Sequence, residues 1–303
     1  MRIDIEILRI LSAFGIVWFH SGISAGKDFA YSGLAFFIIT SVFFAIKSIN
    51  KKLIKDRFYR LLIPYFIWFL IYGFLEYFFK GTLFFEDIDF LQIILAGSSI
   101  HLWYLPFIFF VLLCLDNVDS KIKLNRFFPV SVSLIFLFLV LTSSYWRGVL
   151  FSVPIPQYAQ AIPIVLIGVS VSLSCGVLNQ LAVFLLIISG LFFLAYHEFW
   201  SLFESYSIAF ASACLLCRSF EFSGSRWIFS ISNTTMGVYL VHPLFIYLVK
   251  AIGVAGYMIP IVAFLIALIF VWVGIKLSPP SISRWLFGTA SNVSNNKYQK
   301  KSV

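Results

Sequence analysis

Long apolar segments separated by short polar breaks recur along the whole chain. A helix that crosses the hydrocarbon core of a membrane needs about 20 mostly apolar residues, and somewhat fewer where neighbouring helices shield its ends. Ten segments meet this requirement, at residues 5–24, 29–49, 58–79, 101–117, 127–145, 159–177, 181–196, 203–217, 230–250 and 256–277. The pattern predicts an all-α, polytopic membrane bundle of about ten transmembrane helices, with a short re-entrant or interfacial helix near residues 88–98.

The polar breaks leave no stretch of about 100 residues in which a separate soluble domain would fold. We therefore expect one membrane domain over residues 1–277, followed by a polar, mobile tail over residues 278–303. The first apolar segment lacks both a basic leader and a small-residue cleavage site, so we expect a retained helix rather than a signal peptide.

Composition supports the membrane assignment and charge gives its orientation. The chain is 61% hydrophobic and 12% charged, whereas a soluble domain has about 25% charged residues. The net charge of +9 does not indicate nucleic acid, because Lys and Arg in a membrane protein gather on the cytoplasmic side. We predict that both termini are cytoplasmic, because all Lys and Arg except Lys27, Lys80, Arg147 and Lys250 then fall on that side or within the adjoining helix end.

The first predicted helix carries three ionisable residues, Glu6, Arg9 and His20, which are costly inside a membrane and therefore suggest function. At 100° per residue, the eleven steps from Arg9 to His20 leave a net turn of about 20°, and Glu6 lies about 60° from Arg9. All three share one stripe, with about 16 Å between Arg9 and His20 along the axis. Histidine exchanges protons near neutral pH, which suits a general base, although an ion pair and a satisfied histidine would be the structural explanation.

Two arginines, Arg57 and Arg60, begin the third predicted helix. Their spacing of three residues would place them on one face, where planar guanidinium groups bind phosphate. The surrounding lysines have a simpler explanation, because basic loops set topology and bind anionic lipid head groups. A phosphorylated cytosolic donor is the functional alternative for the two arginines.

Two histidines lie in aromatic surroundings, His101 near Trp103 and His242 near Tyr239. An aromatic belt at the membrane interface is the structural explanation, and a site that holds a sugar is the functional one.

His197 is expected to have no catalytic role. The four cysteines are expected to act as small apolar residues rather than metal ligands, although Cys214 and Cys217 have the CxxC spacing.

These motifs together resemble the acyltransferase-3 family of membrane O-acyltransferases. The resemblance rests on four elements in the family's order: Glu6-Ile7-Leu8-Arg9 with His20 eleven residues after the arginine, Arg57-Phe58-Tyr59-Arg60 continuing to Pro64-Tyr65 and Trp68, His101-Leu102-Trp103-Tyr104-Leu105, and Gly237-Val238-Tyr239-Leu240-Val241-His242. The family usually has Asp where this chain has Glu6, so the carboxylate here is displaced by one methylene. The resemblance covers about residues 2–250.

The resemblance implies an enzyme of the bacterial inner membrane that transfers an acyl group, commonly acetyl, from cytosolic acyl-CoA to a hydroxyl of a cell-envelope sugar, such as surface polysaccharide or O-antigen. It implies catalysis by His20, as general base or acyl acceptor, with Glu6, and donor binding by Arg9, Arg57 and Arg60. We expect His101, Trp103, Tyr239 and His242 to contact the acceptor. We expect no metal, no permanently bound cofactor and no nucleic acid; the partners are acyl-CoA, the envelope glycan or a lipid-linked sugar, and membrane lipid.

A transporter or lipid-linked sugar flippase is the alternative. In that class of protein, buried His and Arg would relay protons or bind a passing anion. The sequence shows neither an evident internal repeat nor the paired broken helices of such transporters, which favours the enzyme.

Overall fold

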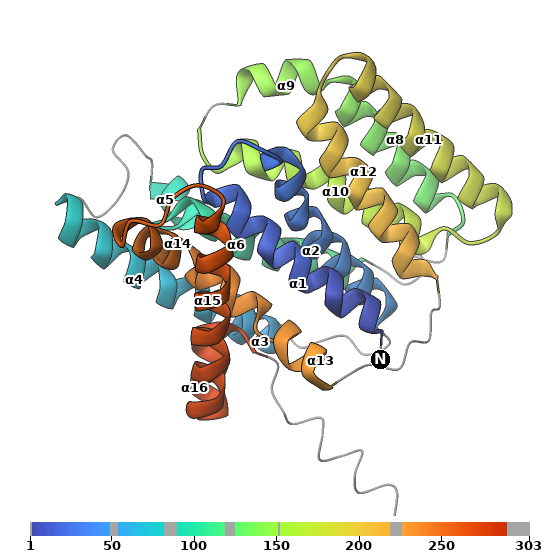
Figure 1. Ribbon diagram of the computed structural model, residues 1–303. Coiled ribbons are helices and arrows are strands. Elements are labelled where there is room, and N and C mark those ends of the chain that lie inside the picture. The colour runs from blue at the N-terminus through green and yellow to red at the C-terminus, as the bar shows by residue number, and fades with distance from the viewer. Residues whose placement is uncertain are drawn as a thin grey trace, which may run out of the picture.

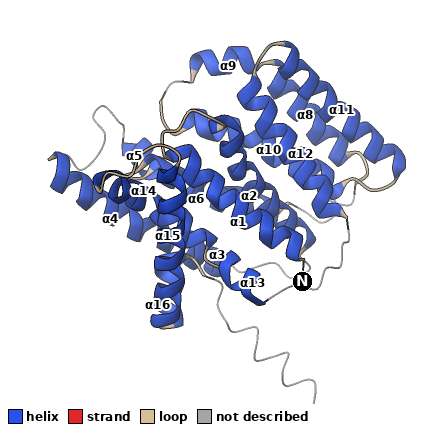
Figure 2. Ribbon diagram, viewed as in Figure 1, coloured by secondary structure: helices blue, strands red, loops and turns tan. Residues whose placement is uncertain are grey.

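The computed structural model describes residues 2–48, 54–81, 90–118, 125–150, 152–218 and 226–289. Within these residues the chain is helical and contains no β-strand (Figure 2). The helices of the first half are α1 (Ile3–His20), α2 (Lys27–Lys47), α3 (Ile54–Arg57), the π-helix η1 (Phe58–Leu62), α4 (Ile63–Lys80), α5 (Phe90–Ala96), the 3-10 helix η2 (Ile100–Trp103) and α6 (Tyr104–Asn117). Those of the second half are α8 (Phe128–Leu141), α9 (Ser143–Val149), α10 (Ile155–Leu173), α11 (Val177–Tyr196), α12 (Trp200–Cys217), α13 (Arg226–Ser232), α14 (Thr235–Ala251), α15 (Met258–Leu277) and α16 (Pro280–Phe287).

Each of the ten predicted spans coincides with a helix, and most of these helices are long and apolar enough to cross a membrane. Seven described segments meet that requirement: 27–47, 54–79, 100–117, 155–173, 177–196, 200–217 and 258–277. Helices α8 and α9, bent by 62° at their junction, would together make an eighth. The structure therefore confirms an all-helical, multi-pass membrane protein.

The other two predicted spans, α1 and α14, are helical but do not meet the requirement, because α1 carries several charged residues and α14 is short. Helix α1 is 18 residues long and carries Asp4, Glu6 and Arg9 in its first two turns, and α14 is 17 residues long. The count of ten, like the side on which the termini lie, stays a prediction. The helix expected near residues 88–98 is found as α5, and residues 88 and 89 lie outside the described part.

Helix α2 lies at the centre of the bundle and packs against α1, α10 and α12, while α14 packs against α1 and α15 (Figure 1). Side chains between these helices are fully buried, as for Ile38, Ile39 and Leu240. The outer faces of α4 and α11 are instead apolar and exposed, with Phe78 and Phe192 both 72% accessible. A soluble protein rarely exposes such continuous apolar surface, so these faces are suited to lipid.

Helices α1 and α2 approach each other closely at two glycines. A Cβ on Gly33 would lie 2.5 Å from the carbonyl oxygen of Ser12, and one on Gly15 would lie 2.8 Å from that of Ala30. Small residues at an interface let helix backbones come together in a membrane protein. This contact fixes the position of α1, and with it the three ionisable residues of that helix.

Substitution of Gly33 by alanine is expected to lower the free energy of unfolding by about 1–3 kcal/mol, because the added methyl must push two backbones apart. Gly148 in α9 is the matched control, since a Cβ there meets nothing within 4 Å. Thermal unfolding of the two purified variants in the same detergent measures the difference. Equal stability of the two variants would show that α1 and α2 can move apart without a measurable loss in the free energy of unfolding.

The segment that begins at Ser278 differs from the polar, mobile tail that the sequence predicts. Residues 280–287 form α16, and Phe287 is only 3% exposed because its ring packs beside Gly274. The indole nitrogen of Trp68 on α4 donates a hydrogen bond of 2.8 Å to the carbonyl oxygen of Leu286. The expectation was wrong for these residues, because a few well-spaced apolar side chains suffice to dock a short helix. Residues 290–303 lie outside the described part.

Candidate functional site

A cavity of about 490 Å³ lies between α1, α2, the η2–α6 corner, α10, α12 and α14. This volume is in the range of about 300–1,000 Å³ that is common for small-molecule sites. The exposed side chains of Lys27 and Asp28, at the start of α2, lie at its rim. The cavity therefore opens at the end of the bundle where α1 finishes and α2 begins.

Three histidines from distant parts of the chain lie close together, and two of them line this cavity. His20 ends α1, His101 lies in η2 and His242 lies in the middle of α14. The ring centroids of His20 and His242 are 5.0 Å apart, those of His101 and His242 are 5.1 Å apart, and those of His20 and His101 are 6.4 Å apart. His20 is partly exposed and lines the cavity, whereas His101 and His242 are 3% and 0% exposed.

Local structure holds His101 in place. Gly97, with φ +84°, turns the chain from α5 into η2, where a Cβ would lie 2.9 Å from Leu102. The Ser99 hydroxyl is 2.9 Å from Nδ1 of His101, and the Tyr239 hydroxyl donates a hydrogen bond to the carbonyl oxygen of His101. A turn that only glycine adopts easily and two side-chain contacts thus present the imidazole to the other two histidines.

The aromatic residues predicted to bind the acceptor do line the cavity. Trp103 and Tyr239 both belong to its wall, as does His101. The ring of Trp103 packs at 5.7 Å from that of Tyr158. Tyr158 does not line the cavity, and this contact holds the indole in position. His242 is not among the residues that line the cavity, which differs from its predicted contact with the acceptor.

The sequence analysis missed the polar residues on the opposite wall. Gln157 and Gln160 of α10 and Ser201 of α12 line the cavity together with Tyr31. The side-chain oxygen of Gln157 is buried and has no hydrogen-bond partner among the described residues. The two glutamines are one helical turn apart at the start of an apolar helix, and that spacing could have identified them.

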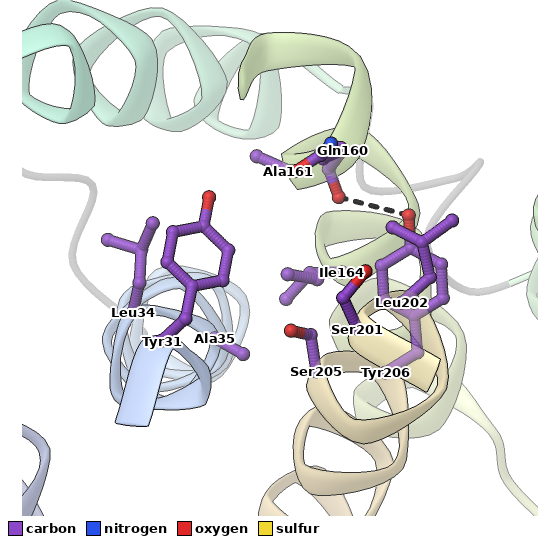
Figure 3. Close-up of a pocket in the computed structure, with 10 residues that line it drawn as sticks. All are labelled: Tyr31, Leu34, Ala35, Gln160, Ala161, Ile164, Ser201, Leu202, Ser205 and Tyr206. Carbon is purple, nitrogen blue, oxygen red and sulfur yellow. Dashed lines mark hydrogen bonds between the residues drawn. The ribbon is translucent and has the colours of Figure 1, made fainter. Parts of the chain in front are cut away.

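A smaller pocket of about 30 Å³ adjoins the cavity between α2, α10 and α12 (Figure 3). It shares Tyr31, Gln160 and Ser201 with the cavity wall. The Tyr206 hydroxyl donates a hydrogen bond of 3.2 Å to the carbonyl oxygen of Gln160 (Figure 3). The pocket has room for water but not for a substrate, and the Tyr206 bond braces the helix that carries the two glutamines.

Charged residues gather at the opposite end of α1. In Figure 1 the N-terminus, α3 and α13 lie at one edge of the molecule, and α5 and α9 lie at the other. A guanidinium nitrogen of Arg9 is 3.0 Å from a carboxylate oxygen of Glu6, which also accepts a hydrogen bond from the Ser232 hydroxyl of α13. These contacts hold Arg9 in a defined orientation.

Glu6, which the family resemblance assigns to catalysis together with His20, does not contact the histidine. Fourteen residues separate them on one helix, which is about 21 Å at 1.5 Å per residue. The partners of Glu6 are Arg9 and Ser232. The carboxylate therefore orients Arg9 and does not contact the imidazole of His20.

Arg57 and Arg60 have different surroundings, although the predicted α-helix would place them on one face. The turn between them is the π-helix η1, a local widening that is frequent at functional sites. Arg57 is 7% exposed and makes two contacts with Asp116 of α6, of 2.7 Å and 2.8 Å. Arg60 lies near Arg9 and Arg284, and its guanidinium has no hydrogen bond or ion pair within the described residues.

Tyr104 connects the two ends of the site. Its side chain lines the cavity, lies within electrostatic range of Arg60 and Arg9, and packs at 5.6 Å from the ring of Tyr239. Tyr104 thus borders both the cavity and the cationic group made by Arg9, Arg60 and Arg284. In the described part of the chain, no three His, Cys, Asp or Glu side chains are arranged to hold a metal ion.

The fold and the site define a multi-pass membrane protein with a histidine-lined cavity at one end of its first helix and a cationic group at the other. The sequence matches the family described as "Acyltransferase domain" over residues 2–276. No match was found among the curated proteins or among the solved structures. The chain belongs to this acyltransferase-3 family, as its motifs predict, and is a membrane acyltransferase.

Proposed function

We propose that this chain transfers an acyl group, acetyl in the simplest case, from cytosolic acyl-CoA to a sugar hydroxyl of a cell-envelope glycan or lipid-linked sugar at the bacterial inner membrane. The observation that carries the proposal is the position of His20 in a cavity that opens at one end of α1, with the cationic group at the other end. Two substrates that approach from opposite faces of a membrane need such an arrangement.

The donor end of the site is argued from charge. Arg60 has no protein partner among the described residues, and Arg9 is held by Glu6 beside it. Guanidinium groups bind phosphate through charge-assisted hydrogen bonds, so these two residues suit the phosphates of CoA. Arg57 forms an ion pair with Asp116. We therefore propose that it stabilises the π-helix and does not contact the donor directly. The long pantetheine arm would then pass Tyr104 toward His20.

The acceptor end of the site is argued from the chemistry of the cavity wall. Amide and hydroxyl groups of Gln157, Gln160 and Ser201 offer both donors and acceptors of hydrogen bonds, as sugar hydroxyls require. Trp103 offers a flat apolar face on the same cavity. The unpaired oxygen of Gln157 suits a hydroxyl of the acceptor.

The reaction uses His20 as a proton carrier. The free ring nitrogen takes the proton of the acceptor hydroxyl while the hydroxyl oxygen attacks the thioester carbonyl carbon. The new carbon–oxygen bond forms, the carbon–sulfur bond breaks, and the imidazolium returns its proton to the CoA thiolate. An acyl-histidine intermediate would move the same atoms in two steps. In either case the products are a sugar ester and free CoA.

Mass spectrometry of the envelope glycans tests the proposal. Glycans from cells that contain the gene should carry one acetyl group more per modified sugar than glycans from cells that lack it, and linkage analysis would identify the hydroxyl. Purified protein in lipid nanodiscs should release free CoA from acetyl-CoA only when the glycan or lipid-linked sugar is added. Identical glycans in both strains and no CoA release in nanodiscs would refute the proposal.

Substitution of Arg60 by glutamine is expected to raise the KM for acyl-CoA by about 10–100-fold, because it removes a charged hydrogen bond to phosphate. The kcat at saturating donor should change much less, since Arg60 is not among the residues that line the cavity with His20. Arg126 is the matched control, because it is an exposed arginine outside the cationic group. Steady-state kinetics in nanodiscs measures both variants, and an unchanged KM in Arg60→Gln would remove this residue from the donor site.

A further inference from the structure

His242 is the buried ionisable residue whose function the proposed reaction leaves open. It lies in the middle of α14, is 0% exposed and does not line the cavity. Its Nδ1 atom is 2.6 Å from the carbonyl oxygen of Tyr239. Because a carbonyl oxygen can only accept a hydrogen bond, Nδ1 carries the proton. The other ring nitrogen, Nε2, then holds a lone pair and can only accept.

Pro243 explains why this carbonyl is available. In a regular α-helix the carbonyl oxygen of Tyr239 would accept a hydrogen bond from the backbone N–H four residues later, at position 243. Residue 243 is proline, which has no N–H. The imidazole of His242 occupies the vacant acceptor instead. Two neighbouring residues in the sequence, His242 and Pro243, thus fix the tautomer of the histidine.

The remaining nitrogen of His242 belongs to a ring that lies beside those of His20 and His101. Nε2 is buried and has no hydrogen-bond partner in the described part of the chain, which is unfavourable unless a donor is supplied. An N–H···N bond of about 2.9 Å together with the radii of two imidazole rings gives a centroid separation of about 5 Å. The rings of His20 and His242 are 5.0 Å apart, with a tilt of 48°. The bond is not formed in this conformation, and forming it requires His20 to rotate about its side-chain bonds.

His101 is the other neighbour of His242, and it is too far from His20 to be the hydrogen-bond partner of that residue. Its ring is 6.4 Å from that of His20, which is longer than the separation for a direct hydrogen bond. Its Nδ1 lies beside the Ser99 hydroxyl, a group that both donates and accepts, so this contact does not fix the tautomer of His101. His101 borders the cavity, and its ring lies 5.1 Å from that of His242 at an angle of 76°. Its Nε2 is likewise buried without a partner among the described residues, so His101 competes with His20 as the donor to His242.

We infer that His242 is a positioning residue that accepts a hydrogen bond from one ring nitrogen of His20 and thereby leaves the other, unprotonated nitrogen facing the cavity. This inference rests on the proposed function and adds a residue to it. A general base must present its lone pair to the hydroxyl that it deprotonates. During the reaction the proton of the acceptor enters and leaves through the cavity-facing nitrogen, while the N–H toward His242 stays in place.

Nitrogen-15 NMR of histidine-labelled protein in nanodiscs tests the tautomer directly, because the chain contains only four histidines. His20 in the unmodified protein should show one neutral tautomer. His242→Phe keeps an aromatic ring but removes the acceptor, so His20 should become a mixture of both tautomers. His242→Gln keeps an acceptor near the position of Nε2 and should restore the single tautomer. A single, unchanged tautomer in His242→Phe would overturn the inference.

Kinetics supplies the second measurement. His242→Phe should lower kcat by about 100-fold, the lower end of what a correctly placed general base contributes, with the KM of both substrates nearly unchanged. His242→Gln should recover most of this loss. Pro243→Ala supplies a backbone N–H that competes with His242 for the Tyr239 carbonyl, so it should lower kcat partially. Pro163→Ala in α10 is the matched control, because the residue before this proline is Ile162 and not a histidine. The control variant should leave kcat unchanged.

The two proposals fail in different ways. Full activity of His242→Phe alongside an inactive His20→Ala would overturn the positioning role and leave the proposed function intact. An unmodified protein that transfers no acyl group would refute the proposed function, and the NMR comparison would still decide whether His242 sets the tautomer of His20. Thermal unfolding of each variant shows that a lost activity is not a lost fold.

Discussion

Replacement of His20 by alanine is expected to reduce the rate of acyl transfer by about 10²–10⁴-fold, because it removes the base that takes the proton of the acceptor hydroxyl. The affinity for acyl-CoA should change little, since the cationic group lies about 16 Å away along α1. The rate is measured as acetyl transfer from labelled acetyl-CoA to the glycan by purified protein in nanodiscs, and donor affinity by binding of CoA to the same sample.

His197 provides the matched control for this substitution. It lies at the C-terminal end of α11, packed against Phe193, and does not belong to the cavity wall. His197→Ala should retain full activity. If the two alanine variants had the same activity, the catalytic role of His20 would be wrong, even if the chain proved to be an acyltransferase.

Replacement of Asp116 by asparagine is expected to lower the free energy of unfolding by about 3–5 kcal/mol, because it leaves the charge of Arg57 buried without a partner. The two side chains are 7% and 16% exposed for Arg57 and Asp116 and are joined by contacts of 2.7 Å and 2.8 Å. Such a loss is a large fraction of the stability of most proteins. Thermal and denaturant unfolding of the purified protein in detergent measure it.

The pair formed by Arg284 and Asp56 serves as an exposed control. It spans 3.2 Å, and its side chains are 22% and 56% exposed, so Asp56→Asn should cost about 1 kcal/mol or less. A double variant with Arg57→Met and Asp116→Leu should be more stable than Asp116→Asn alone, since no unpaired charge remains. Equal stability of the Asp116 and Asp56 variants would show that Arg57 is not held by its ion pair.

Much of the fold was predictable, because the apolar lengths that a membrane demands are local features of the sequence. Each predicted span is a helix, and α5 appears near the expected interfacial segment. The prediction failed at α16, where Phe287 and Leu286 dock a segment whose composition is polar. Composition measures the average of a segment, whereas docking depends on which few side chains meet a partner, here beside Gly274.

The candidate site was predictable as residue types but not as an arrangement. Helical periodicity places Glu6, Arg9 and His20 on one stripe, yet it cannot show that His101 and His242 arrive beside His20 from distant segments. The ion pair of Arg57 with Asp116 was missed for the same reason, because the partners are 59 residues apart. Tertiary packing alone decides such distances.

Helix α1 carries Arg9 of the cationic group near one end and the base His20 at the other. The distance between these two residues must therefore match the distance from the phosphates to the thioester of the bound donor. A substitution in the intervening turns does not change this distance. An insertion of one residue there would turn His20 by about 100° around the axis, and an insertion of a full two turns would keep the direction but shift it by about 10 Å. The segment between these residues should therefore keep a constant length among functional sequences of this family, and its composition should be restricted at Gly15, where α1 meets α2.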